Sequence, residues 1–258
     1  MLSRFFSIAL PLSLGCALNT TAWAAPIHFG DFEGDTVTYE TVLVPESSGS
    51  LFGAPVISGD KLDFSSGLST TFEADSLYGT PDSTLGSINA HITAKPGRAL
   101  TEITATASGF YQFSHYIGDI TADTAITATA RIVARITAVD GVDLPGGPIL
   151  LNPVDQVLVS DNLADLPGAG LIPSWGGSIT FDVAQRAAIE AGISGKITGV
   201  LLTLDTTLDA TSAAGTHSQI ALRVYDAITL TVPEPTSASL LLLSGVVLAT
   251  RRRQRSNP

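Results

Sequence analysis

Three carboxylates alternate with other residues near the start of the chain, at Asp31, Glu33 and Asp35. In an extended backbone alternate side chains point to the same side, so the three carboxylates would lie together. Ca²⁺ takes about six to eight oxygen ligands, carboxylates among them, which makes the cluster a candidate calcium site. The other interpretation, which we favour, is a solvated strand edge protected by its charges. A second acidic group allows the same two interpretations and consists of Asp155, Asp161 and Asp165.

Aromatic side chains gather beside polar groups in the middle of the chain, where residues 109–116 read Gly-Phe-Tyr-Gln-Phe-Ser-His-Tyr. Exposed aromatic rings stack on sugar rings, and this chemistry makes Tyr111, Tyr116 and Trp175 the candidate carbohydrate-binding residues. If the segment is a strand, however, one of its faces must pack in the core. Because large aromatic side chains are buried on average, we favour core packing and keep a sugar platform as the alternative.

Residues for catalysis show no local arrangement. The four histidines, His28, His91, His115 and His217, lack the close spacing of a metal site. No Gly-x-Ser-x-Gly sequence marks a nucleophile at a strained turn. A triad, or two carboxylates placed for glycoside hydrolysis, can arise from folding alone and leaves no local signal. We therefore expect a protein that is not an enzyme and that has no cofactor. The alternatives are Ca²⁺ at the acidic cluster and a polysaccharide-active enzyme.

The composition narrows the class of protein. The chain has 258 residues, of which 24 are acidic, 13 are basic and 45% are hydrophobic, and its mean hydropathy is +0.33. A low content of charge together with this hydropathy argues against disorder. The acidic balance excludes the basic surface that non-specific nucleic-acid binding requires, so nucleic acid is not an expected partner.

Period-two alternation predicts the elements that position these residues. Over Ala125–Val139, isoleucine and alanine occupy one face while threonine and arginine occupy the other, which is typical of a long half-buried strand. Further strands are predicted at residues 36–44, 61–64, 87–94, 100–108, 177–181, 199–208 and 219–232. No succession of strand, helix and strand units appears, which disfavours a parallel sheet. The prediction is an all-β fold, a jelly-roll-like sandwich of two antiparallel sheets.

One short helix interrupts the predicted strands. Asp182 can cap it, Val183–Ala191 propagates it, and Gly192 can end it in the left-handed conformation. The Asp140-Gly141 pair predicts a turn, and the Pro- and Gly-rich stretch from Leu144 to Pro173 predicts a long surface loop.

The first 24 residues have the features of a signal peptide. A basic residue precedes an apolar run over residues 5–18, and Ala22 and Ala24 supply the small side chains that signal peptidase requires. We place the cut after Ala24. The run is shorter than the roughly 20 apolar residues that span a bilayer, which disfavours an uncleaved membrane helix. Cys16 follows a glycine as in a lipoprotein signal, but Ser13 stands where that signal has leucine.

The last 26 residues carry the most specific pattern in the sequence. Directly after Val232 its parts, in order, are the run Pro233-Glu234-Pro235, an uncharged apolar helix at about residues 236–250, and the cluster Arg251, Arg252 and Arg253. The prolines bar helix from their own segment, and the arginines stop translocation on the cytoplasmic side. Fifteen residues span only about 22 Å as a helix, which is short for a permanent anchor. This order resembles the PEP-CTERM sorting signal of exosortase substrates.

The resemblance implies a route through the cell rather than an activity. It implies processing by signal peptidase and an exosortase, a transient transmembrane intermediate in the inner membrane, and delivery to the cell surface or extracellular matrix of a Gram-negative bacterium that makes exopolysaccharide. We therefore expect an exported, non-enzymatic structural or adhesive component of a biofilm matrix, with exopolysaccharide as a partner. A generic tail anchor is the alternative for the tail, and a calcium-assisted carbohydrate-binding module is the alternative for the body.

Processing at both ends would leave one domain, residues 25–232, between the signal peptide (1–24) and the sorting signal (233–258). A chain of about 200 residues buries roughly 70% of its unfolded surface, enough for a stable domain without crosslinks. Residues 25–233 hold 23 acidic and 8 basic side chains, a net charge of −15, and contain no cysteine. The charge favours solubility, and the missing thiol excludes disulfides from the mature form.

Overall fold

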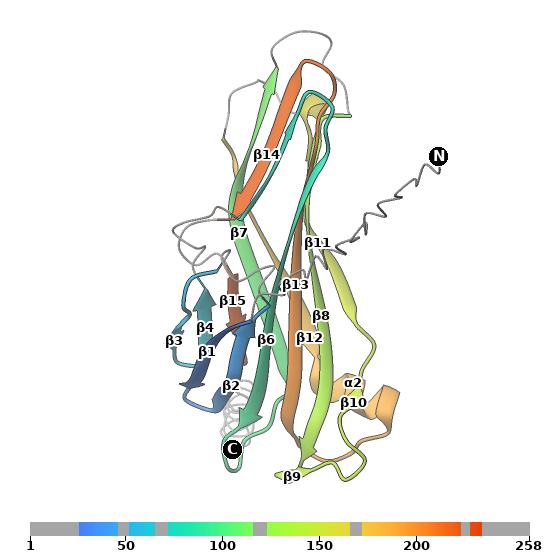
Figure 1. Cartoon of the computed structure of the whole chain (residues 1–258). Helices are drawn as coiled ribbons and strands as arrows, with labels where there is room; N and C mark the ends of the chain where they lie inside the picture. Colours follow the sequence, from blue (N-terminus) through green and yellow to red (C-terminus); the bar gives the residue numbers. More distant parts are fainter. Residues whose placement is uncertain are drawn as a thin grey trace, which may run out of the picture.

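The structure, a computed structural model, describes residues 26–45, 52–64, 72–115, 123–165, 172–222 and 228–233. Two antiparallel sheets pack face to face in an elongated sandwich, with a short helix at one end (Figure 1). The predicted all-β sandwich is therefore confirmed. The predicted signal peptide and nearly all of the predicted sorting signal, including its apolar helix, lie outside the described residues. Within the described part, no helix is long and apolar enough to cross a membrane.

The first sheet has eight strands in the order β1-β2-β6-β13-β8-β10, and β9 and β11 also pair with β8. Their bounds are β1 Ile27–Glu33, β2 Val37–Val44, β6 Asp82–Ala94, β8 Ala125–Val139, β9 Val142–Asp143, β10 Ile149–Leu150, β11 Val154–Asn162 and β13 Ile197–Thr211. The long central strand β13 pairs with β6 on one edge and with β8 on the other over most of its length. These three strands form a continuous platform.

The second sheet has seven strands in the order β3-β4-β15-β7-β14-β5, and β12 pairs with the free edge of β7. Their bounds are β3 Val56–Ser58, β4 Lys61–Phe64, β5 Glu73–Leu77, β7 Glu102–His115, β12 Ser174–Asp182, β14 Thr216–Leu222 and β15 Ile228–Thr231. One edge of β7 pairs first with β15 and then with β14, and the change of partner falls near Ser108. The single predicted strand over residues 219–232 is therefore two strands, β14 and β15.

The core lies between the two sheets and follows the predicted alternation. In β8 the isoleucine and alanine side chains from Ile126 to Ile136 are buried, whereas Arg131 and Arg135 are exposed on the outer face. Alanine at the centre of β7 and β8 lets the sheets approach closely, since it adds little thickness between them. The largest fully buried side chains include Tyr39, Phe64, Phe72 and Phe181.

The helix α2 (Val183–Ala191) is confirmed with both of its predicted caps. The Asp182 carboxylate accepts a hydrogen bond from the backbone N–H of Gln185, and Gly192 adopts a φ of 68° at the C-terminal end. Burial of Val183 and Ala187 fixes the helix against the sandwich. Glu190 accepts a hydrogen bond from the backbone of Asn152, which ties the helix to the segment before β11.

The long loop predicted between Leu144 and Pro173 is wrong. The structure has β10 and β11 there, followed by a short 3-10 helix at Leu163–Asp165, and β11 pairs with β8 over nine residues of chain. β11 is an edge strand with a register shift between Val157 and Val159. Because a bulge interrupts alternation and an edge strand has little buried surface, the sequence carries no period-two signal there.

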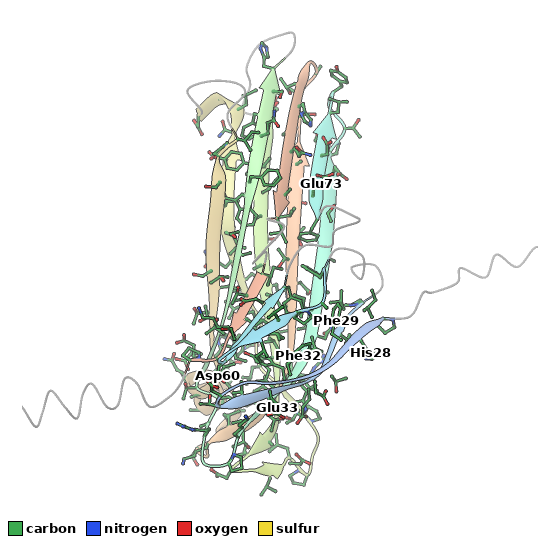
Figure 2. The ribbon with its side chains drawn as sticks, turned by 90° about the vertical axis from the view of Figure 1, so that its left-hand side faces the viewer. His28, Phe29, Phe32, Glu33, Asp60 and Glu73 are labelled. Atoms are coloured by element: carbon green, nitrogen blue, oxygen red, sulfur yellow. The ribbon has the colours of Figure 1, made fainter. Side chains whose placement is uncertain are left out.

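A buried carboxylate joins the two sheets at one end. Asp60, in the turn between β3 and β4, accepts hydrogen bonds from the backbone N–H of Thr36 at 2.7 Å, from the Thr36 hydroxyl at 2.5 Å and from the Val37 N–H at 3.3 Å. Its backbone carbonyl accepts from the Tyr39 hydroxyl at 2.7 Å and from the Val232 N–H at 3.3 Å. Figure 2 shows Asp60 near the end of β1 that carries Glu33. We call these five residues the Asp60 cluster.

Candidate functional site

A pocket of about 680 Å³ opens at the end of the first sheet where β6 and β8 finish and β13 begins, the lower end in Figure 1. Its lining comes from the end of β6 and the following link, from the turn between β8 and β9, and from the start of β13. The lining residues are His91, Thr93–Arg98, Ala138, Asp140, Gly141, Asp143, Lys196, Thr198 and Gly199. We call this the end pocket.

Positive charge is concentrated at the end pocket. Lys95, Arg98 and Lys196 line it, and they are three of the seven basic residues in the described ranges. The Lys95 ammonium is engaged, since it donates to the Gly34 carbonyl at 2.6 Å and lies 3.2 Å from the Glu33 carboxylate. The Arg98 guanidinium and the Lys196 ammonium have no hydrogen bond or ion pair with any described residue. Two cations at this pocket are therefore available to a ligand.

Two carboxylates share the rim with these cations. Asp140 and Gly141 have φ values of 53° and 78°, which is the two-residue type I′ turn of a hairpin and confirms the predicted turn. Oδ1 of Asp140 accepts the Lys196 N–H at 3.0 Å, and Gly141 N–H donates to the Thr198 hydroxyl at 2.9 Å. These bonds fix the rim, while the exposed Asp143 carboxylate stands beside it without a described partner.

A chain of three polar side chains crosses the first sheet at the floor of the pocket. The Nδ1 atom of His91 lies 2.9 Å from the Glu40 carboxylate, and its Nε2 atom lies 2.9 Å from the Thr137 hydroxyl. His91 is on β6 and Thr137 on β8, so their contact passes over β13. Gly199 of β13 permits it, because a Cβ there would lie 2.4 Å from the Thr137 hydroxyl. We call Glu40, His91 and Thr137 the cross-sheet chain.

The cross-sheet chain has the acid, imidazole and hydroxyl order of a nucleophilic triad. Its hydroxyl, however, belongs to a threonine within a paired strand, and Thr137 is not among the residues that line the end pocket. A nucleophile must be presented to the substrate, as a serine on a sharp turn is. We therefore interpret the chain as a support that fixes the imidazole of His91 in the pocket floor.

A smaller pocket of about 250 Å³ lies beside the end pocket on the outer face of the first sheet and shares His91 with it. Arg135 and the hydrogen-bonded pair of Asn89 and Thr203 line this side pocket. Arg135 is exposed and has no hydrogen bond or ion pair within the described part of the chain. The outer face thus offers two adjoining hollows with an unpaired cation in each.

One buried polar atom in the end pocket has no partner. The Thr93 hydroxyl oxygen is inaccessible to solvent, and no described residue hydrogen-bonds to it. Thr93 lines the end pocket next to His91 on β6. A buried hydroxyl without a partner is costly, and because this one is inaccessible, a ligand in the pocket would reach it only after a neighbouring side chain moves.

Two of the three predicted carbohydrate-binding residues are core residues. Tyr111 is 5% exposed and Trp175 is 6% exposed, so neither ring offers a face to solvent. The Tyr111 hydroxyl donates to the Asp161 carboxylate, and burial followed by this hydrogen bond raises the pKa of Tyr111 to about 12. Trp175 packs over Gly109, where an added Cβ would lie 2.6 Å from its Nε1 atom. Tyr116 lies outside the described residues.

The first acidic cluster does not converge. Asp31 accepts the Thr41 N–H at 2.8 Å, Glu33 pairs with a lysine, and Asp35 is exposed. The predicted alternation fails in β1 because register shifts on both sides of Gly30 leave the half-buried aromatics three residues apart, at Phe29 and Phe32 (Figure 2). The described residues contain no group of three or more side chains placed to hold a metal. The calcium site stays a prediction.

The second acidic group is occupied by interactions within the chain. Asp155 lies 3.7 Å from Arg131, Asp161 accepts from Tyr111, and Asp165 accepts from the Asn162 side chain at 2.5 Å.

Of the predicted sorting residues, the structure describes only two. Val232 is buried, with 1% of its surface exposed, and Pro233 is exposed.

No local pattern in the sequence predicts the end pocket. Lys95, Arg98 and Lys196 come from segments about one hundred residues apart, and only the pairing of β6 with β13 brings them together. A signal was present, however. Two of the few basic residues in an acidic chain flank the turn Pro96-Gly97, and such a local excess of positive charge marks a site for an anion.

Comparison with protein-family models and with curated proteins found no match. Among solved structures, the chain is similar to a carbohydrate-binding module, TmCBM61, in complex with β-1,4-galactotriose, at 9% identity and a TM-score of 0.23, over 76% of this chain and 87% of that one. It is similar to the VP2 subviral particle of infectious bursal disease virus at 12% identity and a TM-score of 0.21, over 84% of this chain and 59% of that one. It is also similar to the family GH12 endoglucanase 3 of Trichoderma harzianum at 7% identity and a TM-score of 0.21, over 83% of this chain and 96% of that one. At these TM-scores the similarities carry no argument about function.

Proposed function

We propose that this chain is an exported protein of the cell surface or extracellular matrix. Signal peptidase removes residues 1–24, the C-terminal helix holds the chain transiently in the inner membrane, and an exosortase cuts near Pro233-Glu234-Pro235. The mature protein then acts as a non-enzymatic structural or adhesive component of an exopolysaccharide matrix. The observation that supports this proposal is where the sandwich ends relative to the tail motif.

The described core reaches Val232, the residue directly before the motif. Val232 is buried and its N–H donates to the Asp60 carbonyl, whereas Pro233 is exposed. β15, just before it, lies between β4 and β7 inside the second sheet. A cut within Pro233-Glu234-Pro235 would therefore leave every described core residue in place, while a cut a few residues earlier would open the sheet. This boundary is what processing of a folded protein requires.

The body is suited to an environment outside the cell. It contains no cysteine, so no incorrect disulfide can form in an oxidising compartment. Its core extends through both sheets, from Val37 to Val232. A net charge of −15 over residues 25–233 keeps the protein soluble. The same charge disfavours contact with an anionic polysaccharide everywhere except where positive charge is concentrated.

Carbohydrate binding is the second candidate function, and the end pocket favours it. The pocket is concave and combines unpaired cations with hydrogen-bonding groups. The buried rings of Tyr111 and Trp175 do not support the aromatic platform that we expected. Assistance by Ca²⁺ and a polysaccharide-active enzyme have no further support from the described residues.

The test of the sorting proposal is the compartment of a tail variant in the native host. Pro233→Ala combined with Glu234→Ala should accumulate in the inner membrane, because the exosortase no longer recognises its motif. Pro81→Ala changes an exposed proline outside the tail and serves as the matched control, which should reach the surface like the wild type. Equal delivery of the tail variant and the control would refute the proposal.

A further inference from the structure

We propose that the end pocket and the adjoining side pocket bind an acidic polysaccharide whose sugars carry carboxylates, with Arg98 and Lys196 as the carboxylate-binding residues. This inference deepens the proposed function, because it names the class of ligand that an exported matrix protein would hold. It rests on the proposed function only for the place where the protein encounters the ligand, outside the cell.

The charge distribution selects an anion. The body carries an excess of 15 negative charges, yet two unpaired cations, Arg98 and Lys196, line one pocket and a third, Arg135, lines the next. Cations without partners that surround a concave surface focus the local potential and attract anionic ligands. Arg98 can bind a carboxylate with two parallel hydrogen bonds, while Lys196 acts as a point charge at the rim.

The remaining groups select a sugar rather than a small inorganic anion. Asp140 and Asp143 stand on the same rim and would repel a bare sulfate or phosphate. Carboxylates are, however, good acceptors for sugar hydroxyls. A ligand with one carboxylate and several hydroxyls per unit satisfies both kinds of group, because it supplies acceptors to the cations and donors to the acids.

The size and shape of the site suit a chain rather than a single unit. The end pocket, at about 680 Å³, lies within the range of about 300 to 1,000 Å³ that is typical of ligand sites. The side pocket continues past His91 along the outer face of β6, β13 and β8. Among the described residues, no Phe, Tyr or Trp lines either pocket, so recognition would depend mainly on charge and hydrogen bonds. Binding should therefore weaken strongly with salt.

The experiment is a calorimetric titration of the whole chain, purified in detergent, with a hexamer of galacturonate. The matched probe is the same hexamer with its carboxylates methyl-esterified, and sodium sulfate is the probe for an anion alone. We expect the free hexamer to bind at least about tenfold more tightly than the ester, a difference of about 1.4 kcal/mol. Sulfate should not compete at equal charge concentration. Equal binding of ester and acid, or no binding of the acid at millimolar concentration, would overturn the proposal.

Variants locate the site. Arg98→Gln with Lys196→Gln should weaken binding of the free hexamer at least about tenfold, because both ligand-facing cations are lost. Lys61→Gln with Arg131→Gln removes the same charge from positions outside both pockets and should change affinity less than about twofold. Equal losses in both double variants would mean that net charge alone attracts the ligand, and the pocket assignment would fail.

The binding experiment is independent of sorting. A chain that binds the hexamer but keeps its C-terminus in the inner membrane would refute the sorting proposal and leave the pocket assignment standing. A chain that is sorted correctly but does not bind the hexamer would refute the pocket assignment and leave the sorting proposal standing.

Discussion

The Asp60 cluster and the end pocket both contain charged side chains, and they use them in opposite ways. At the Asp60 cluster all of the charge is satisfied within the protein. The Asp60 carboxylate accepts three hydrogen bonds, and the backbone carbonyl of the same residue accepts two more. At the end pocket the charged side-chain groups of Arg98, Lys196 and Asp143 have no described partner, and the buried Thr93 hydroxyl has none either.

The difference separates groups that serve the fold from groups that serve a ligand. Burial of a charge is tolerated only when its hydrogen bonds are satisfied within the protein. A charged side-chain group without a partner contributes little to the stability of the fold. We infer that the Asp60 cluster closes the sandwich and that the end pocket meets the environment.

The largest effect on stability should come from breaking the Asp60 cluster. Asp60→Ala leaves the Thr36 and Val37 donors buried without an acceptor, and we expect a loss of roughly 3 kcal/mol in the free energy of unfolding. Asp143→Ala, at the end pocket, is the matched control and should change stability by less than about 0.5 kcal/mol. Urea unfolding measures both. Similar losses in the two variants would remove the distinction between the regions.

A smaller loss is expected where the cross-sheet chain passes over β13. Gly199→Ala places a methyl group 2.4 Å from the Thr137 hydroxyl and 3.0 Å from the Ala138 Cβ, so the neighbours must move. We expect a cost of about 2 kcal/mol, typical of overpacking, and a changed imidazole signal of His91 in the NMR spectrum. Gly146→Ala, where nothing lies within 4 Å of the new Cβ, should be close to neutral. An unchanged His91 signal in Gly199→Ala would contradict the described contact.

Alkaline pH should weaken the fold through its buried phenols. Burial raises the pKa of Tyr111 to about 12, and burial near Asp60 and Asp63 raises the pKa of Tyr39. The unfolded chain loses phenol protons near pH 10 while the folded chain keeps them, so the free energy of unfolding should fall as the pH rises from about 10 to 12. Tyr111→Phe should make this fall shallower. The same slope in wild type and variant would show that Tyr111 does not contribute.

The smallest effect on stability belongs to the cations of the end pocket. Arg98→Gln with Lys196→Gln should leave the free energy of unfolding within about 0.5 kcal/mol of the wild type, because neither side chain has a described partner. Thermal unfolding in the absence of ligand measures this. A loss of several kcal/mol would mean that the cations support the fold, which would weaken their assignment to a ligand.

Local patterns predicted most of the elements. The alternation in residues 125–139 gave β8 with its observed bounds, and the capping residues Asp182 and Gly192 gave both ends of α2. Each of these signals lies within the element that it describes. β11 escaped prediction because Val154–Asn162 is an edge strand with a bulge, in which pairing with β8 rather than its own pattern fixes the conformation.

The candidate site was harder to predict because it depends on contacts between distant segments. Lys95, Asp140 and Lys196 meet only after β6, β8 and β13 have paired. The exposed aromatic platform failed for the opposite reason, since Tyr111 and Trp175 were judged by their chemistry rather than by the buried face of their strands. The sorting motif needs no fold to be recognised, and its residues after Pro233 lie outside the described structure.

The most direct test of the account is the intact mass of the protein recovered from its native host, measured separately for the inner membrane, the outer surface and the medium. The account predicts that the form at the surface or in the medium begins at Ala25 and ends near Pro233-Glu234-Pro235, with Val232 retained. A form at the surface that still carries Arg251, Arg252 and Arg253 would contradict it.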